Sequence, residues 1–191
     1  MPFPPAIARM LSQALGDEKT EELIETLDFA DAGHGYDQFG LHPAFVALGN
    51  VVTSPLYRHY FRVRSFGHEH IPQDGPAVLA ANHSGTLPID GAMLWLDVLR
   101  HTSPPRVPRP IADYFVPSLP IIGNLFARCG MVGGSRGNAR ALLRDQQLLM
   151  IFPEGVPGIG KLYSERYQLQ EWRQGHCELA IRHQAPVIPV G

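Results

Sequence analysis

The sequence predicts an α/β fold in which a largely parallel central sheet is flanked by helices. Three short apolar runs, at 77–81, 147–152 and 186–190, are typical of strands that are buried on both faces. Segments with helical spacing of apolar residues lie between and beside them, at 89–99, 138–144 and 175–183. Because strand and helix alternate from Val63 onward, the strands are expected to run parallel.

The composition is that of an ordinary globular domain. The chain has 191 residues, of which 45% are hydrophobic and 18% charged, which argues against extensive disorder. The formal net charge of −2 predicts no global attraction to nucleic acid. The two cysteines, Cys129 and Cys177, form no CxxC pair, so we expect a reducing compartment and buried, unreactive thiols.

The first part of the chain, 1–61, is expected to be a helical segment that associates with a membrane. Two short helices are predicted between Pro5 and Leu27, a polar linker over 30–40, and an apolar stretch from Pro43 that ends among basic residues. Such a stretch can lie in a membrane interface, or pack on the core with a solvated basic edge. No signal peptide is expected, since the N-terminus lacks a basic region followed by an apolar one. No transmembrane helix is expected, since no apolar run reaches ~18 residues.

The second part, 62–191, is expected to form the α/β domain. A strand is predicted over 62–66 because apolar and polar residues alternate there. A proline-rich loop over 103–110 and a helical segment over 116–129 follow the helix at 89–99.

The segment Asn82-His83-Ser84-Gly85-Thr86-Leu87-Pro88-Ile89-Asp90 carries the strongest chemical signal. It begins where a buried strand ends, which is where ligand sites gather in open α/β sheets. Asp90 is expected near a helix N-terminus, where it can orient His83 as a general base. A purely structural hydrogen bond between the two side chains is the alternative.

Two further segments predict acceptor-binding residues. Glu154 and Gly155 follow the second buried strand, and Lys161 lies in the Gly-rich loop after them. Ser135 opens a helix behind the glycines of 130–134, and Arg136 there can hold a phosphate. The alternatives are a turn or cap role for Glu154 and a surface position for Arg136. The run 185–190 is interpreted as structural.

Taken in order, these segments resemble the lysophospholipid acyltransferase superfamily, the glycerolipid acyltransferases with an NHx4D-type motif. The resemblance covers about Arg62 to Gly191 and implies His83 and Asp90 as catalytic residues. It implies acceptor binding by a further set of residues: Gly130, Ser135, Arg136, Glu154, Gly155 and Lys161. The block Phe152-Pro153-Glu154-Gly155 matches the family outright.

The sequence departs from the family pattern at two positions. Six residues separate His83 from Asp90 where the usual motif has four, and this longer form resembles the monoacylglycerol and diacylglycerol acyltransferase branch. Val156-Pro157 stands where the family pattern has Thr-Arg, which leaves Lys161 as the substitute basic residue. Both departures leave room for a neutral acceptor. Because similar members continue beyond the last motif strand, the chain is expected to be truncated at Gly191.

The resemblance implies transfer of a fatty acyl group from acyl-CoA or an acyl carrier protein to a hydroxyl of lysophosphatidic acid, glycerol 3-phosphate or a mono- or diacylglycerol. The expected partners are the acyl thioester donor, the glycerolipid acceptor and a membrane surface, with no nucleic acid, no cofactor and no metal. The expected location is peripheral, on the inner, cytoplasmic face of a membrane. The alternatives are an inactive lipid- or membrane-binding module and an esterase or thioesterase.

Overall fold

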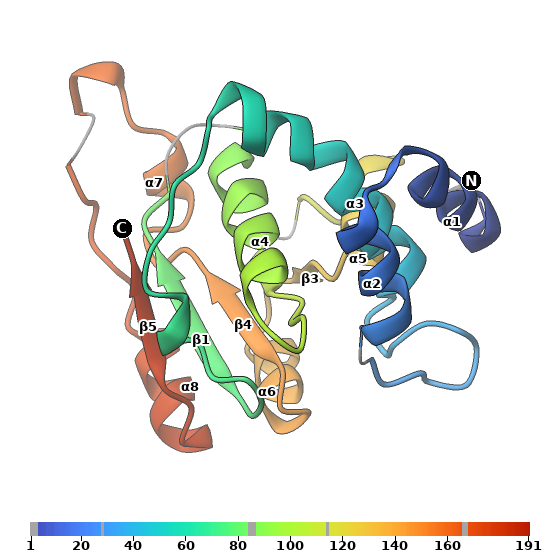
Figure 1. Ribbon diagram of the computed structural model, residues 1–191. Helices are drawn as coiled ribbons and strands as arrows, with labels where there is room; N and C mark the ends of the chain where they lie inside the picture. Colours follow the sequence, from blue (N-terminus) through green and yellow to red (C-terminus); the bar gives the residue numbers. More distant parts are fainter. Residues whose placement is uncertain (1–3, 28, 84–86, 114, 166–167) are drawn as a thin grey trace.

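The computed structural model describes residues 4–27, 29–83, 87–113, 115–165 and 168–191 (Figure 1). Its centre is a five-stranded sheet in the order β3-β2-β4-β1-β5, in which every pair of neighbouring strands is parallel. The strands are β1 Ala77–Ala81, β2 Arg109–Ala112, β3 Val132–Gly133, β4 Leu148–Ile151 and β5 Val187–Val190. The expected α/β class and parallel sheet are confirmed.

Helices cover both faces of this sheet. The α-helices are α1 Pro5–Leu15, α2 Glu18–Thr26, α3 Pro43–Pro55, α4 Ile89–His101, α5 Ile122–Arg128, α6 Arg136–Arg144, α7 Val156–Ile159 and α8 Gly175–His183. Shorter helical turns are the π-helix η1 Leu56–Tyr60 and the 3-10 helices η2 His68–His70 and η3 Tyr163–Glu165. Among the described residues, none of these helices is both long and apolar enough to cross a bilayer.

The two faces of the sheet follow the alternation of side chains along its central strands. Ala77 and Leu79 of β1 point into one cluster with α4, whereas Val78 points into another with α6 and α8. All five residues of β1 are buried, which explains why the strand is a continuous apolar run.

The N-terminal helices belong to the same packed structure as the sheet. Leu23 of α2 and Val46 of α3 lie in the cluster that contains β1 and α4. Asp37, between α2 and α3, is buried and forms an ion pair with Arg109 of β2, with 2.6 Å between Oδ2 and Nη1. The polar stretch 30–40 is therefore tied to the sheet rather than being a simple linker.

Four local predictions were wrong. The strand expected to be buried at 186–190 is β5, which lies at one edge of the sheet and is partly exposed. Residues 62–66 form no strand; Ser65 hydrogen-bonds to Asp97 instead of to a neighbouring strand. The helix expected over 116–129 begins only at Ile122, since Pro117 and Pro120 cannot donate backbone hydrogen bonds. The loop expected over 103–110 ends at Arg109, where β2 begins. Arg109 and Pro110 are not typical of a strand, so the sequence did not indicate β2.

Candidate functional site

The candidate site lies at the carboxyl ends of β1 and β4, which are neighbours in the sheet. His83 follows β1 after one residue, and Glu154 follows β4 after two. Because the strands are parallel, both loops emerge at the same edge of the sheet, the edge at which α/β folds bind ligands.

His83 and Asp90 are brought together by the start of α4. The distance between His83 Nδ1 and Asp90 Oδ2 is 2.8 Å, so the contact expected from the sequence is present. Pro88 is the N-cap residue and Asp90 lies in the first turn, where the helix dipole favours a carboxylate. The other carboxylate oxygen, Oδ1, accepts a hydrogen bond from the Gly91 backbone N–H at 2.7 Å, which fixes the carboxylate against the helix.

The His83 ring is held on a second side by Phe152. The two rings are stacked with their centroids 4.3 Å apart and a 26° angle between their planes. The histidine side chain is 15% exposed and the Asp90 side chain 29%, so the pair is set into the surface yet reachable. With Nδ1 donating to Asp90, the tautomer leaves a lone pair on Nε2 that can accept a proton.

Glu154 ties the two loops of the site together. Its side chain is fully buried, and Oε1 accepts a hydrogen bond from the His83 backbone N–H at 3.1 Å. Oε2 accepts from Lys161 Nζ at 2.6 Å and from the Gln170 backbone N–H at 2.9 Å. Burial favours the neutral acid, but these hydrogen bonds outweigh it and hold the pKa of Glu154 below its ordinary value. Both carboxylate oxygens thus bind groups of this chain and keep the His83 loop in place.

Gly155 and Lys161 both stabilise the turn that follows β4. Gly155 has φ 61° and ψ −148°, a conformation open only to glycine, and its N–H closes the turn on the Phe152 carbonyl at 3.0 Å. Lys161 also donates to the Gln168 carbonyl at 3.1 Å. The segment expected as an open loop after Gly155 begins with the short helix α7.

The residues of the 130–136 block lie at different places. Gly130 precedes β3 with φ 103°, and a Cβ there would meet the side chains of Leu41 and Val107 at 3.1 Å, so its position is a packing requirement. Ser135 is the N-cap of α6 and accepts from the Asn138 backbone N–H at 2.9 Å, as expected. Arg136 is exposed, with Nη1 3.8 Å from Glu178 Oε2.

Arg173 is a neighbour of the site that was not expected from the sequence. Its guanidinium lies beside Gly155, where a Cβ would be 3.7 Å from Cζ, and its backbone N–H donates to the Pro153 carbonyl at 3.1 Å. Arg173 and Arg136 line the same shallow hollow at the start of α8. Nothing near Arg173 in the sequence marks it, because the contact depends on how 168–174 folds back onto the Phe152–Gly155 turn.

The tetrahedral intermediate of acyl transfer needs oxyanion donors, and the backbone near Ser84 and Gly85, where we expect them, lies outside the described residues. Of the two cysteines, Cys177 is exposed, contrary to expectation, whereas Cys129 is partly buried and burial raises its pKa to about 12.

Comparison with known proteins gives a consistent result. The model of the Acyltransferase family matches residues 62–191. An uncharacterized protein of Mycobacterium tuberculosis (strain H37Rv) is 37% identical over 161 residues, which are 82% of this chain and 44% of the relative. An uncharacterized protein of Mycobacterium leprae is 35% identical over 158 residues, 80% of this chain and 42% of the relative.

A human protein named "DGAT1/2-independent enzyme synthesizing storage lipids" is 33% identical over 126 residues, which are 65% of this chain and 37% of the human protein. The chain therefore spans less than half of the length of the curated relatives it matches.

Proposed function

Because this chain belongs to the Acyltransferase family, we propose that it moves a fatty acyl group from an acyl thioester to a hydroxyl of a glycerolipid. The observation that carries the proposal is the His83–Asp90 pair: Nδ1 is occupied by the carboxylate, and Nε2 is left for the acceptor at the ligand-binding edge of the sheet.

In the proposed mechanism, Nε2 of His83 removes the proton of the acceptor hydroxyl while Asp90 stabilises the resulting imidazolium. The hydroxyl oxygen attacks the thioester carbonyl. The tetrahedral intermediate then collapses to the ester, and the thiolate that leaves takes the proton back from the imidazolium. The roles of His83 and Asp90 rest on this geometry and on the family pattern. The reaction needs no metal and no cofactor beyond the thioester substrate.

Arg136 and Arg173 are proposed to bind a phosphate in the hollow that they share. Planar guanidinium groups suit phosphate oxygens, and α6 begins at Arg136 with its backbone N–H groups. The phosphate belongs either to the CoA donor or to a phosphorylated acceptor. Glu154, Gly155 and Lys161 act indirectly in this proposal, by shaping the turn beside which Arg173 lies.

The nature of the acceptor is open between a phosphorylated and a neutral glycerolipid. The lengthened spacing from His83 to Asp90 and the storage-lipid name of the human relative favour a neutral acceptor. A phosphate subsite for CoA is compatible with either class.

We further propose that the chain works at a membrane surface, on the inner, cytoplasmic face, since acyl glycerols reside in bilayers. Exposed apolar side chains follow the carboxyl ends of three strands: Leu87 after β1, Phe115 after β2 and Val156 after β4. Others lie on the N-terminal segments, among them Met10 of α1 and Tyr60 of η1. Apolar and aromatic side chains of this kind enter the interface of a bilayer.

Vesicle flotation tests the membrane proposal. Arg62 and Arg64 are the basic residues to change, because Arg58 is engaged with Asp17 at 2.7 Å. Glutamate at both positions is expected to weaken binding to anionic vesicles, whereas Arg182→Glu on the exposed side of α8 is expected to leave it unchanged. Equal binding by all three proteins would remove the electrostatic part of the idea.

The test of the reaction is acyl transfer from labelled acyl-CoA to glycerol 3-phosphate, lysophosphatidic acid, monoacylglycerol and diacylglycerol. An ester product that is lost in His83→Ala and kept in the exposed control His70→Gln is expected. Release of free fatty acid without an acceptor would instead indicate a thioesterase. A folded, vesicle-bound protein that forms neither product would indicate an inactive binding module.

KM values of two arginine variants test whether the hollow binds a phosphate of the donor or of the acceptor. If Arg136→Ala and Arg173→Ala raise the KM for acyl-CoA with every acceptor, the hollow binds the donor. If they raise the KM only for phosphorylated acceptors, it binds the acceptor.

A further inference from the structure

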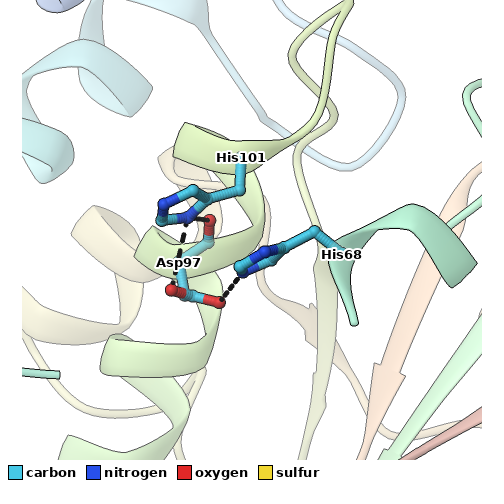
Figure 2. Close-up of side chains that lie close together, drawn as sticks. All are labelled: His68, Asp97 and His101. Atoms are coloured by element: carbon cyan, nitrogen blue, oxygen red, sulfur yellow. Dashed lines mark hydrogen bonds and ion pairs between the residues drawn. The ribbon is translucent and has the colours of Figure 1, made fainter. Parts of the chain in front are cut away.

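A second cluster of histidine and carboxylate groups lies at the far end of α4. Asp97 and His101 are one helical turn apart on α4, and His68 of η2 points toward Asp97 from the segment that precedes β1 (Figure 2). The distance from His68 Nε2 to Asp97 Oδ2 is 2.9 Å, and from His101 Nδ1 to Asp97 Oδ1 it is 3.3 Å. This cluster plays no part in the reaction proposed above.

The arrangement does not suit nucleophilic catalysis, although Ser65 is also present. Ser65 Oγ lies 3.0 Å from His68 Nε2, and Asp97 Oδ2 lies 2.9 Å from the same nitrogen. A serine–histidine–aspartate triad needs the serine on one ring nitrogen and the aspartate on the other. A cluster in which one nitrogen meets both groups cannot relay a proton from the serine.

The carboxylate of Asp97 is buried at the centre of the cluster. The residue is 5% exposed, and Ser65, Tyr57 and His68 hydrogen-bond to its carboxylate. Within the described part of the chain its ion-pair partners are histidines, with no lysine or arginine among them. Both ion-pair partners of this buried carboxylate are thus side chains that can bind a metal ion through a ring nitrogen.

The donor atoms also have the chemistry and the spacing of a metal site. Each residue offers one ligand atom, and the three atoms lie within 4.8 Å of one another. Ligands about 2.0 Å from a tetrahedral zinc ion are about 3.3 Å apart. His101 Nδ1 lies 3.3 Å from Asp97 Oδ1 and His68 Nε2 lies 2.9 Å from Oδ2, so the two histidines approach different oxygens of one carboxylate. Tyr57 and Ser65 donate to Oδ1, in the manner of the groups that orient a ligating carboxylate.

We propose that His68, Asp97 and His101 bind a divalent transition-metal ion of the zinc class. Imidazole nitrogen with carboxylate oxygen suits such ions rather than Mg²⁺ or Ca²⁺. No metal site was expected from the sequence, because the nine histidines stand in no HExxH or CxxC context. His68 lies 29 positions from Asp97, so no short motif marks this cluster.

Binding requires one of the two rings to turn. The imidazoles of His68 and His101 are stacked, with centroids 4.2 Å apart and planes 16° from parallel, and a metal must lie in the plane of each ring that binds it. His101 is the ring that moves: its side chain is 39% exposed, and its Nδ1 gives up a 2.8 Å contact with the Asp97 carbonyl oxygen.

The bound ion would clamp the segment before β1 to the C-terminal half of α4. Asp97 lies seven residues after Asp90, about 10 Å along the helix axis. The ion is therefore too far from His83 to act on the substrate, and its role is to fix α4.

Zinc binding tests the proposal. Protein stripped with a chelator is titrated with Zn²⁺ in competition with a chromophoric chelator, and the double variant His68→Gln/His101→Gln is compared with wild type. The matched control is His70→Gln, which changes the exposed histidine of the same short helix. Wild type and control are expected to bind one more zinc ion than the double variant, or to bind it at least tenfold more tightly. Far-UV circular dichroism checks that each variant is folded.

Among the described residues, zinc could also bind at two other places, which the ligand types and a further variant distinguish from the proposed site. Cys177 Sγ lies 3.3 Å from His176 Nε2, and His83 lies beside Asp90. X-ray absorption of the zinc-loaded wild type is expected to show imidazole and oxygen ligands at about 2.0–2.1 Å and no sulfur at about 2.3 Å. Equal zinc binding by wild type and the double variant, sulfur in the shell, or loss of the ion in His83→Ala would overturn the proposal.

Discussion

The two ends of α4 carry the same residue types in opposite settings. At its start, Asp90 meets His83 at the edge of the sheet, and the aspartate side chain is 29% exposed. Toward its end, Asp97 is buried and receives hydrogen bonds from Tyr57, Ser65 and His68. His83 presents its Nε2 atom to the ligand-binding edge of the sheet. The groups around Asp97 instead direct their hydrogen-bond donors toward its buried carboxylate. A histidine–aspartate pair therefore acquires its chemistry from which nitrogen is occupied and from where the pair lies on the sheet.

Replacing His83 should produce the largest effect. His83→Ala removes the general base, and acyl transfer is expected to fall about 10³-fold because general base catalysis contributes roughly 10²–10⁴-fold. The midpoint of thermal unfolding should change little, since the imidazole is only partly buried. Steady-state transfer assays beside a thermal melt measure both quantities. Full activity in this variant would show that the start of α4 is as structural as its end.

Asp90→Asn should have the next largest effect. The amide can still contact Nδ1, but it favours the wrong tautomer and no longer stabilises the imidazolium, so kcat should fall about 10²-fold with little change in KM. The measurement is kcat and KM for the acceptor that the wild-type protein acylates. A change in KM alone would mean that Asp90 binds substrate rather than orienting the base.

Asp97→Asn should affect stability rather than the chemical step. The variant weakens the hydrogen bonds that Ser65, Tyr57 and His68 make to a buried carboxylate, so unfolding should be easier by about 2 kcal/mol. Chemical denaturation at pH 7 measures the loss. Acyl transfer by the folded fraction should stay within a few-fold of wild type, and a loss comparable to that of His83→Ala would contradict the comparison.

The loss in Asp97→Asn should also depend on pH. Burial raises the pKa of Asp97, but hydrogen bonds from Ser65, Tyr57 and His68 outweigh it, so the folded-state pKa lies below the ordinary value of 3.8. Such a carboxylate stabilises the fold above its unfolded pKa, and this contribution disappears as pH falls below it. The difference between wild type and variant should therefore be full at pH 7 and shrink below about pH 4.

Tyr57→Phe should have the smallest effect. It removes one hydrogen bond to Asp97 and should lower the free energy of unfolding by about 1 kcal/mol. Burial, together with the bond to Asp97, raises the pKa of Tyr57 to about 12. Its stabilising effect should thus persist at neutral pH and fade as pH rises from 10 toward 12. Unfolding curves at pH 7 and pH 11 for both proteins check the sign, and an unchanged difference between them would remove Asp97 as its partner.

The sequence by itself determined the α/β class, the strands β1, β4 and β5, and the candidate pair His83 and Asp90. β1 and β4 are largely buried, and strands buried on both faces must be apolar throughout, so they stand out in the sequence. His83 and Asp90 are close in the chain, and one strand end and one helix start suffice to bring them together. The Phe152–Gly155 block is likewise local, and its turn depends on a glycine.

Only the tertiary structure decided the features that depend on distant partners. β2 was missed because Arg109 looks unfit for a buried strand until Asp37, 72 residues away, neutralises it. Glu154 was expected to face the acceptor, yet packing turns its carboxylate toward the His83 backbone and Lys161. The cluster around Asp97 joins Tyr57, Ser65 and His68 to α4 across 29 to 40 positions. Local spacing records the period of a helix or strand, whereas these contacts are fixed by how the packed elements meet.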